Sequence, residues 1–72
     1  MKELVALRRR RLLTQTELAE KVGVSLKAVQ AWEGGRAQPR LRHIGRLAEV
    51  LGVSAEELLE TFEAAEAGKA AA

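Results

Sequence analysis

The side chains best suited to chemistry in this sequence are cations, and they fall into two clusters. Residues 1–12 carry a net charge of +4, and residues 34–48 carry another +4 with no acid among them. Residues 13–33 between the clusters carry −1, and residues 49–72 carry −5. Two basic clusters that flank one segment favour a face that meets a polyanion. Either cluster alone is also compatible with an ordinary solvated helix face.

The residue types from which most catalytic and metal sites are assembled are missing. The sequence has no Cys, Asp, Asn or Tyr, and His43 is the only histidine. Disulfides, thiolate metal sites and cysteine nucleophiles are thereby excluded. The hydroxyls of Thr14 and Ser25 stand at expected helix starts with no histidine partner. We therefore expect no enzyme activity, no cofactor, no metal site and a surface position for His43.

Length and composition indicate one small folded domain. The chain has 72 residues, of which 47% are hydrophobic and 31% are charged, which is typical of a globular domain and not of a disordered chain. No apolar run approaches the ~20 residues that span a bilayer, and the N-terminus does not resemble a signal peptide. We expect a cytoplasmic, nucleoid-associated protein without a membrane partner.

Start and stop signals divide the sequence into five helices and predict an all-α fold. Gly45 falls inside the fourth helix at a cost of about 1 kcal/mol relative to Ala, so we expect a close backbone contact there. Residues 1–62 are expected to form the domain, and the Ala-rich residues 63–72 a helical extension or a frayed end. The expected helices cover about 2–11, Thr14 to Gly23, Ser25 to Gly34, about 41–50, and the residues after Ser54.

Residues 15–34, "QTELAEKVGVSLKAVQAWEG", have the spacing of a helix-turn-helix unit, which pairs the second and third helices. Ala19 is small where the two helices must cross closely, and Gly23 tolerates the positive φ of the turn. Five further positions must be apolar because they bury the crossing, and all five are: Leu18, Val22, Val24, Val29 and Trp32.

From Leu4 to Leu59 the chain resembles the phage-repressor and Cro-like helix-turn-helix proteins, also called the xenobiotic-response-element family. The resemblance rests on "L..LR" from Leu4, "LTQ.ELA" at 13–19, "VGVS" at 22–25, "WE.G" at 32–35, "QP.L" at 38–41 and "LA..LGVS..ELL" at 47–59. It implies a compact, lambda-repressor-like domain of five helices. It also implies binding to double-stranded DNA, usually as a dimer on a palindromic operator.

The resemblance carries roles over to individual residues. The glutamine that matches Gln15 contacts a DNA phosphate at the N-terminus of the second helix, where the helix dipole also favours an anion. The residues that match Arg8 and Glu33 often form a buried pair that ties the first helix to the third. The residues that face the DNA groove match Leu26, Lys27, Gln30 and Ala31.

A helical wheel supports this outward face independently, because Val29 and Trp32 must point inward. Lys27 can donate to guanine, and Gln30 can pair with adenine. Leu26 and Ala31 can contact thymine methyl groups. Lys27 is also compatible with a plain solvated position, and Leu26 with packing on a partner protein.

Arg36, Arg40 and Arg42 are the expected phosphate ligands after Gln15, since they follow the third helix without a compensating acid. Two positions depart from the family pattern. A glycine usually stands where this chain has Leu12, so the end of the first helix is expected to shift or to turn less tightly. A Ser or Asp usually caps the fourth helix where Arg40 stands, and losing a cap costs about 1 kcal/mol.

The main functional hypothesis is a sequence-specific transcriptional regulator, a repressor that binds a palindromic operator as a homodimer. The fifth helix is the expected dimer surface, because its apolar stripe continues beyond what the core should need: Leu59, Phe62 and Ala65. The alternative is a protein-interaction module of the antitoxin or polymerase-adaptor kind, marked by an exposed apolar patch near Leu26 or Phe62 and weak DNA binding.

Overall fold

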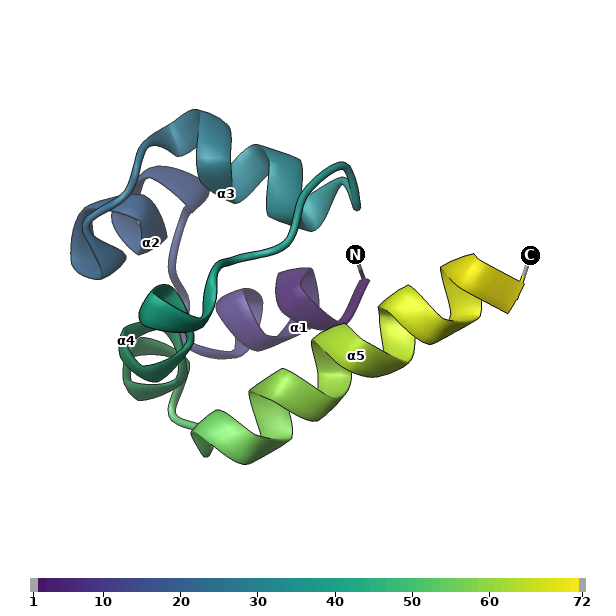
Figure 1. Cartoon of the computed structure of the whole chain (residues 1–72). Coiled ribbons are helices and arrows are strands. Elements are labelled where there is room, and N and C mark those ends of the chain that lie inside the picture. Colours follow the sequence, from purple (N-terminus) through teal and green to yellow (C-terminus); the bar gives the residue numbers. More distant parts are fainter. Residues whose placement is uncertain (1, 72) are drawn as a thin grey trace.

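The fold consists of five helices connected by short turns and one longer loop (Figure 1). The computed structural model describes residues 2–71, and the side chains of residues 2–63. No strand occurs between residues 2 and 71. The predicted all-α architecture is therefore confirmed. The helices are α1 (Lys2–Arg10), α2 (Gln15–Val22), α3 (Leu26–Glu33), α4 (Leu41–Leu51) and α5 (Ala55–Ala71).

Helices α2 and α3 pack against each other and form the helix-turn-helix unit. At the start of α2 the Thr14 hydroxyl accepts from the Glu17 amide at 3.1 Å, and the Glu17 carboxylate accepts from the Thr14 amide at 2.8 Å. Gly23 ends α2 with a φ of 83°, in the left-handed region that favours glycine. The Ser25 hydroxyl then caps α3 by accepting from the Ala28 amide at 3.1 Å.

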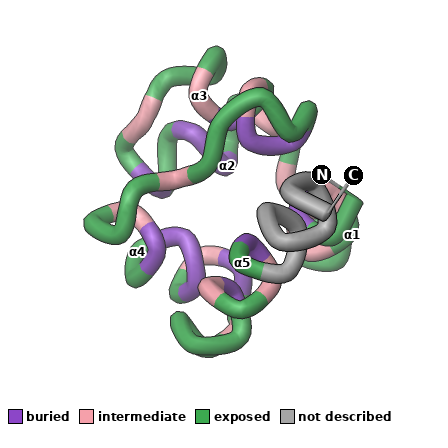
Figure 2. Tube along the Cα trace, turned by 45° about the vertical axis from the view of Figure 1, so that its right-hand side comes forward, coloured by how far each residue is buried: buried purple, intermediate pink, exposed green. Residues whose placement is uncertain are grey.

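The core lies where the inward faces of the helices meet, as the buried segments of Figure 2 show. Each helix contributes at least one side chain that is 0–1% exposed: Leu4, Leu18, Val29, Leu47 and Leu58. Since α3 commits Val29 and Trp32 to this core, the opposite side of α3 is left for solvent or a ligand.

Phe62 belongs to the core, because it is only 2% exposed. The carbonyl of Phe62 also accepts a hydrogen bond from Gln38 Nε2 at 3.1 Å, which ties the loop before α4 to α5. The expectation that Phe62 lies beyond what the core needs is therefore wrong, since so small a domain uses this ring to complete its interior. The side chain of Ala65, the other residue of that stripe, lies outside the described residues.

Helix α1 ends at Arg10, one residue earlier than expected, and Leu12 takes the position that usually holds glycine. Leu12 has a φ of 57° and is 89% exposed. Its amide donates to the Arg9 carbonyl at 2.9 Å, and the Leu13 amide donates to the Arg8 carbonyl at 3.3 Å. This is the left-handed ending that glycine favours, so the tight turn is kept and Leu12 takes a strained conformation.

Helix α4 begins at Leu41 with Arg40 at the N-cap, and no side chain caps it. Gly45 lies in the middle of α4, and a Cβ added there would meet nothing within 4 Å. The expectation of a close backbone contact at Gly45 is therefore wrong. The residue faces open space on the solvent side of the helix.

Candidate nucleic-acid interface

The outward face of α3 presents the residues expected to meet DNA bases. Lys27 and Gln30 are exposed, and Leu26 is 39% exposed. Ala31 is half-buried, and its carbonyl accepts from the amides of the loop that follows the helix. Three of the four expected positions are thus exposed, and Ala31 lies at the edge of the face.

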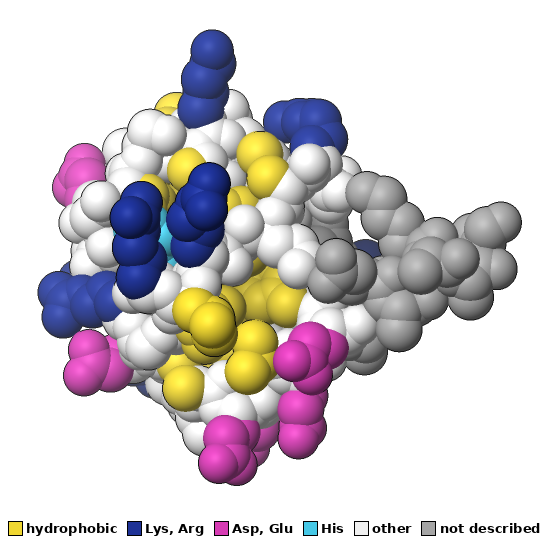
Figure 3. Space-filling model, in the orientation of Figure 1, with side chains coloured by type: hydrophobic (Ala, Val, Ile, Leu, Met, Phe, Trp, Pro, Cys, Tyr) yellow, Lys and Arg dark blue, Asp and Glu magenta, His cyan; other side chains and the backbone are white. Residues whose placement is uncertain are grey.

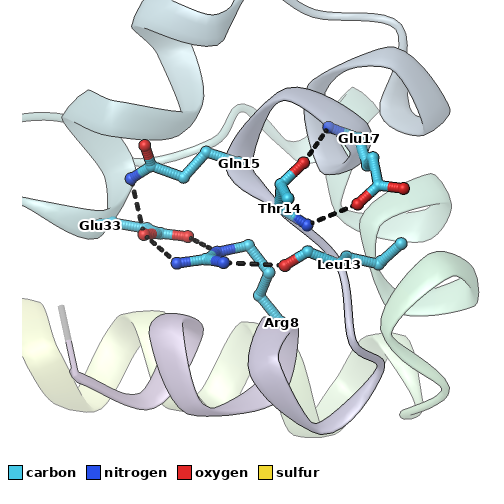
Figure 4. A network of polar contacts seen from close by, with 6 residues as sticks. All are labelled: Arg8, Leu13, Thr14, Gln15, Glu17 and Glu33. Atoms are coloured by element: carbon cyan, nitrogen blue, oxygen red, sulfur yellow. Dashed lines mark hydrogen bonds and ion pairs between the residues drawn. The ribbon is translucent and has the colours of Figure 1, made fainter.

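Arg8 connects helix α1 to the end of α3 and to the turn before α2 (Figure 4). Its Nε lies 2.6 Å from Glu33 Oε2, and its Nη2 donates to Glu33 Oε1 at 3.2 Å. Its Nη1 donates to the Leu13 carbonyl at 2.8 Å. The two side chains of the ion pair are 11% and 6% exposed. The pair therefore fixes the end of α3 relative to α1, and with it the direction of the helix that presents Lys27.

Gln15, at the start of α2, joins the same network, because its Nε2 donates to Glu33 Oε1 at 2.9 Å. Burial raises the pKa of Glu33, but the hydrogen bonds from Arg8 and Gln15 and the charge of Arg8 outweigh burial and hold that pKa below its ordinary value. Glu33 is therefore a carboxylate at neutral pH. The amide of Gln15, expected to contact a phosphate, has one of its two donor hydrogens directed to Glu33.

The expected phosphate ligands are exposed arginines around the start of α4. Arg40 and Arg42 are exposed, and Arg42 Nε donates to His43 Nε2 at 3.4 Å. Arg36 is exposed too, but its guanidinium lies back over Gly34, with Nη1 only 3.3 Å from the place of a Cβ on that glycine. Figure 3 shows cationic side chains over α3 and the start of α4, and acidic ones along the edge formed by α5.

His43 is half-buried instead of lying fully on the surface. Its ring centroid is 6.2 Å from that of Trp32, with the planes tilted by 43°. Contact with the indole explains this burial. Sequence patterns carry no signal for it, because the two residues come from different helices. His43 thus supports the position of Arg42 beside α3.

Among the described side chains, those of residues 2–63, no group of three or more His, Cys, Asp or Glu residues is placed to hold a metal ion. Within the described backbone, residues 2–71, no helix combines the length and the apolar character that crossing a bilayer requires.

Residues 4–58 match the family model described as helix-turn-helix. No curated protein and no solved structure was found to match the chain. The matched segment runs from the first core residue of α1 to the buried Leu58 of α5, so it includes the whole α2–α3 unit and the Arg8–Glu33 pair. The chain therefore belongs to the Cro/C1-type helix-turn-helix family of DNA-binding transcription regulators.

Proposed function

We propose that the chain recognises a specific duplex sequence, binds it as a homodimer at a palindromic operator, and represses transcription there. The observation that carries the proposal is the exposed face of α3 formed by Leu26, Lys27 and Gln30, held rigidly from behind by the Arg8–Glu33 pair. A rigid helix that presents its first turns to solvent is what the major groove accepts.

The side chains on that face suggest which base edges they read. Lys27 can donate to guanine O6 and N7, and Gln30 can form paired hydrogen bonds with adenine. Leu26 can contact a thymine methyl group, with Ala31 at the margin. One cation and one amide give few polar contacts, so we expect modest discrimination from α3 itself.

The affinity in this proposal comes mostly from phosphate contacts on both sides of α3. Arg40 and Arg42 are exposed at the start of α4, and Arg36 joins them if its guanidinium leaves Gly34. On the other side, Gln15 uses the second hydrogen of its Nε2 for a phosphate while the first stays on Glu33. Each cation that neutralises a phosphate releases counterions and steepens the dependence on salt.

The dimer surface we propose is on α5, with Leu59 as its half-buried apolar residue. Phe62 is unavailable to a partner because the core of its own chain covers it. A two-fold dimer would place two recognition helices about one DNA turn, roughly 34 Å, apart. The operator would then be an inverted repeat with that spacing.

The alternative, a protein-interaction module built on the same scaffold, is favoured by one observation. Leu41 is 74% exposed at the start of α4, close in sequence to the arginines assigned to phosphates. If a partner protein covered Leu26 and Leu41, these residues would form an adaptor or antitoxin surface. Such a protein would bind every duplex weakly.

Selection of binding sites from a random duplex library separates the two functions. We expect an enriched inverted repeat whose affinity falls steeply as salt rises from about 50 to 200 mM, since several phosphates are neutralised. A library that shows no enrichment, together with binding that does not respond to salt, would exclude the DNA-reading function and leave the adaptor.

A further inference from the structure

A groove outside the proposed DNA-contacting residues combines cations with an apolar floor. It lies between the end of α1, the end of α2 and the second half of α4, and encloses about 450 Å³. Three cations face a single carboxylate, so the groove is electropositive. Its lining consists of Arg11, Leu13, Lys21, Arg46, Glu49 and Val50.

The two guanidinium groups of the groove lie against helix ends, and one of them, that of Arg46, is held by a backbone carbonyl. Arg46 Nε donates to the Lys21 carbonyl at 2.9 Å, at the end of α2. Arg11 lies over the end of α4, with Nη1 3.3 Å from the place of a Cβ on Gly52. Arginine at a helix C-terminus is stabilising by itself, which accounts for the inner contacts. Arg46 Nη1 also lies 3.5 Å from Glu49 Oε2, but the Arg46 side chain is 61% exposed, so a ligand can still reach it.

Leu12 adds an apolar, strained side chain directly between two residues of this groove, Arg11 and Leu13. It is 89% exposed and holds a left-handed φ of 57°, a conformation that strains a residue with a Cβ. Backbone strain that persists often marks a functional position. An exposed leucine in this strained conformation favours a partner that has apolar groups over a bare phosphate backbone.

The chain itself carries a surface of the complementary kind on α5. Glu56, Leu59, Glu60 and Glu63 follow one another at i, i+3, i+4 and i+7, and therefore share one helix face. The three glutamates are exposed and Leu59 is half-buried. The face spans ~10 Å at 1.5 Å per residue. This face of α5 presents carboxylates around an apolar residue, Leu59. The groove presents cations around two apolar residues, Leu13 and Val50.

We propose that a second copy of this chain lays the 56/59/60/63 face of its α5 in the groove of the first. The glutamates of one copy then pair with Arg11, Lys21 and Arg46 of the other, and Leu59 packs beside Leu12. When the exchange is mutual the pair closes as a two-fold dimer. The contact gives the homodimer of the proposed function a specific interface, and it rests on that function.

Charge reversal with rescue tests this contact on the full chain, first without DNA and then on the selected operator. The groove variant carries Lys21→Glu and Arg46→Glu, and the helix variant carries Glu60→Lys and Glu63→Lys. A matched control, Lys2→Glu with Arg9→Glu, makes the same charge change as the groove variant at a separate hollow beside α1. Circular dichroism checks that each variant is folded, and sedimentation velocity at about 50 and 500 mM salt follows association, because salt screens exposed charges.

We expect the wild type and the control to dimerise at low salt, and less so at high salt. Each reversed variant alone should have its dimer dissociation constant raised at least about tenfold, since like charges then face each other. An equimolar mixture of the two variants should recover association, because each supplies the surface that the other now fits.

Two results overturn the proposal: a groove variant that dimerises like the wild type, or a mixture that does not recover. A groove variant that still dimerises but loses affinity for DNA would in addition assign the groove to the DNA backbone. If the variants still occupy a symmetric operator as dimers, this contact is wrong and the homodimer stands. If the wild type stays monomeric both free and on DNA, the homodimer itself fails.

Discussion

The guanidinium of Arg8 in α1 holds the carboxylate of Glu33, the last residue of α3, with Nε 2.6 Å from Oε2. The two residues are 25 positions apart in the sequence. Because α3 is only eight residues long, fixing its final residue fixes the direction of the whole helix. The exposed face of α3 is thus oriented by a buried pair on the side of the helix away from solvent.

Replacing Arg8 should therefore be costly. In Arg8→Ala the Glu33 carboxylate stays buried without its cation, and we expect the free energy of unfolding to fall by about 3 kcal/mol. Urea denaturation measures the loss. The matched control is Glu49→Ala, because the Glu49 side chain is 72% exposed and its Oε2 lies 3.5 Å from Arg46 Nη1. This control should change the free energy of unfolding by less than about 0.5 kcal/mol. Equal losses in the two variants would contradict a special role for the buried pair.

The Arg8–Glu33 pair also makes the stability of the fold depend on pH. The pKa of Glu33 in the folded chain lies below its ordinary value, which is about 4.3 in an unfolded chain. A lowered folded pKa contributes stability that is fully present above the unfolded value and is lost as pH falls through the folded one. The free energy of unfolding of the wild type should therefore exceed that of Glu33→Gln most at neutral pH. This difference in stability should narrow below about pH 4.

Urea unfolding of both proteins at several pH values checks this. Glu17 also has a lowered pKa, held down mainly by the hydrogen bond from the Thr14 amide, so the variant should keep a residual dependence on acid. A gap that stays constant from pH 7 to about pH 3 would show that protonation of Glu33 is not what couples stability to pH.

Leu12→Gly should raise the free energy of unfolding by up to about 1 kcal/mol. Glycine relieves the strain of the left-handed φ, although it also loses more entropy on folding. Leu12→Ala keeps the strain and should be neutral, because the leucine side chain is 89% exposed. Thermal unfolding of the two variants side by side makes the comparison. A destabilised glycine variant would mean that the leucine side chain contributes to the fold.

Gly45→Ala should also stabilise the protein, by about 1 kcal/mol, because alanine is the better helix former and the added Cβ meets nothing within 4 Å. The contrasting variant is Gly23→Ala. Because Gly23 has a φ of 83°, which strains any residue with a Cβ, this variant should be destabilised by roughly 1–2 kcal/mol. Chemical denaturation gives both values. A loss of stability at Gly45 would point to a contact made only in an assembly.

Local patterns were enough to predict much of this fold. The Thr14–Glu17 capping box and the turn at Gly23 depend on residues close in sequence, so their geometry follows from spacing alone. The inward faces of α3 and α4 follow from helical periodicity in the same way. The outward residues of α3 were carried over from the family resemblance, and the same periodicity supports them because it directs Val29 and Trp32 inward.

Features that depend on packing between helices were harder to predict. Whether Phe62 fills the core or protrudes depends on how far α5 lies from α1 and α4, and periodicity carries no distances. The second partner of Glu33, Gln15, is 18 positions away from it, and this contact can be recognised only when α2 and α3 are placed together. The groove at Arg46 likewise requires α2 and α4 to end side by side.

The central claim is that α3 reads bases while the arginines beside it hold phosphates. The most direct test measures Lys27→Ala and Arg42→Ala on the selected operator and on single-base variants of it. We predict that Lys27→Ala costs about 1–3 kcal/mol and relaxes the preference at one base pair, whereas Arg42→Ala weakens all duplexes alike and lowers the salt slope by about 1. If Lys27→Ala weakens all duplexes equally and leaves every base preference intact, α3 does not read the sequence through Lys27.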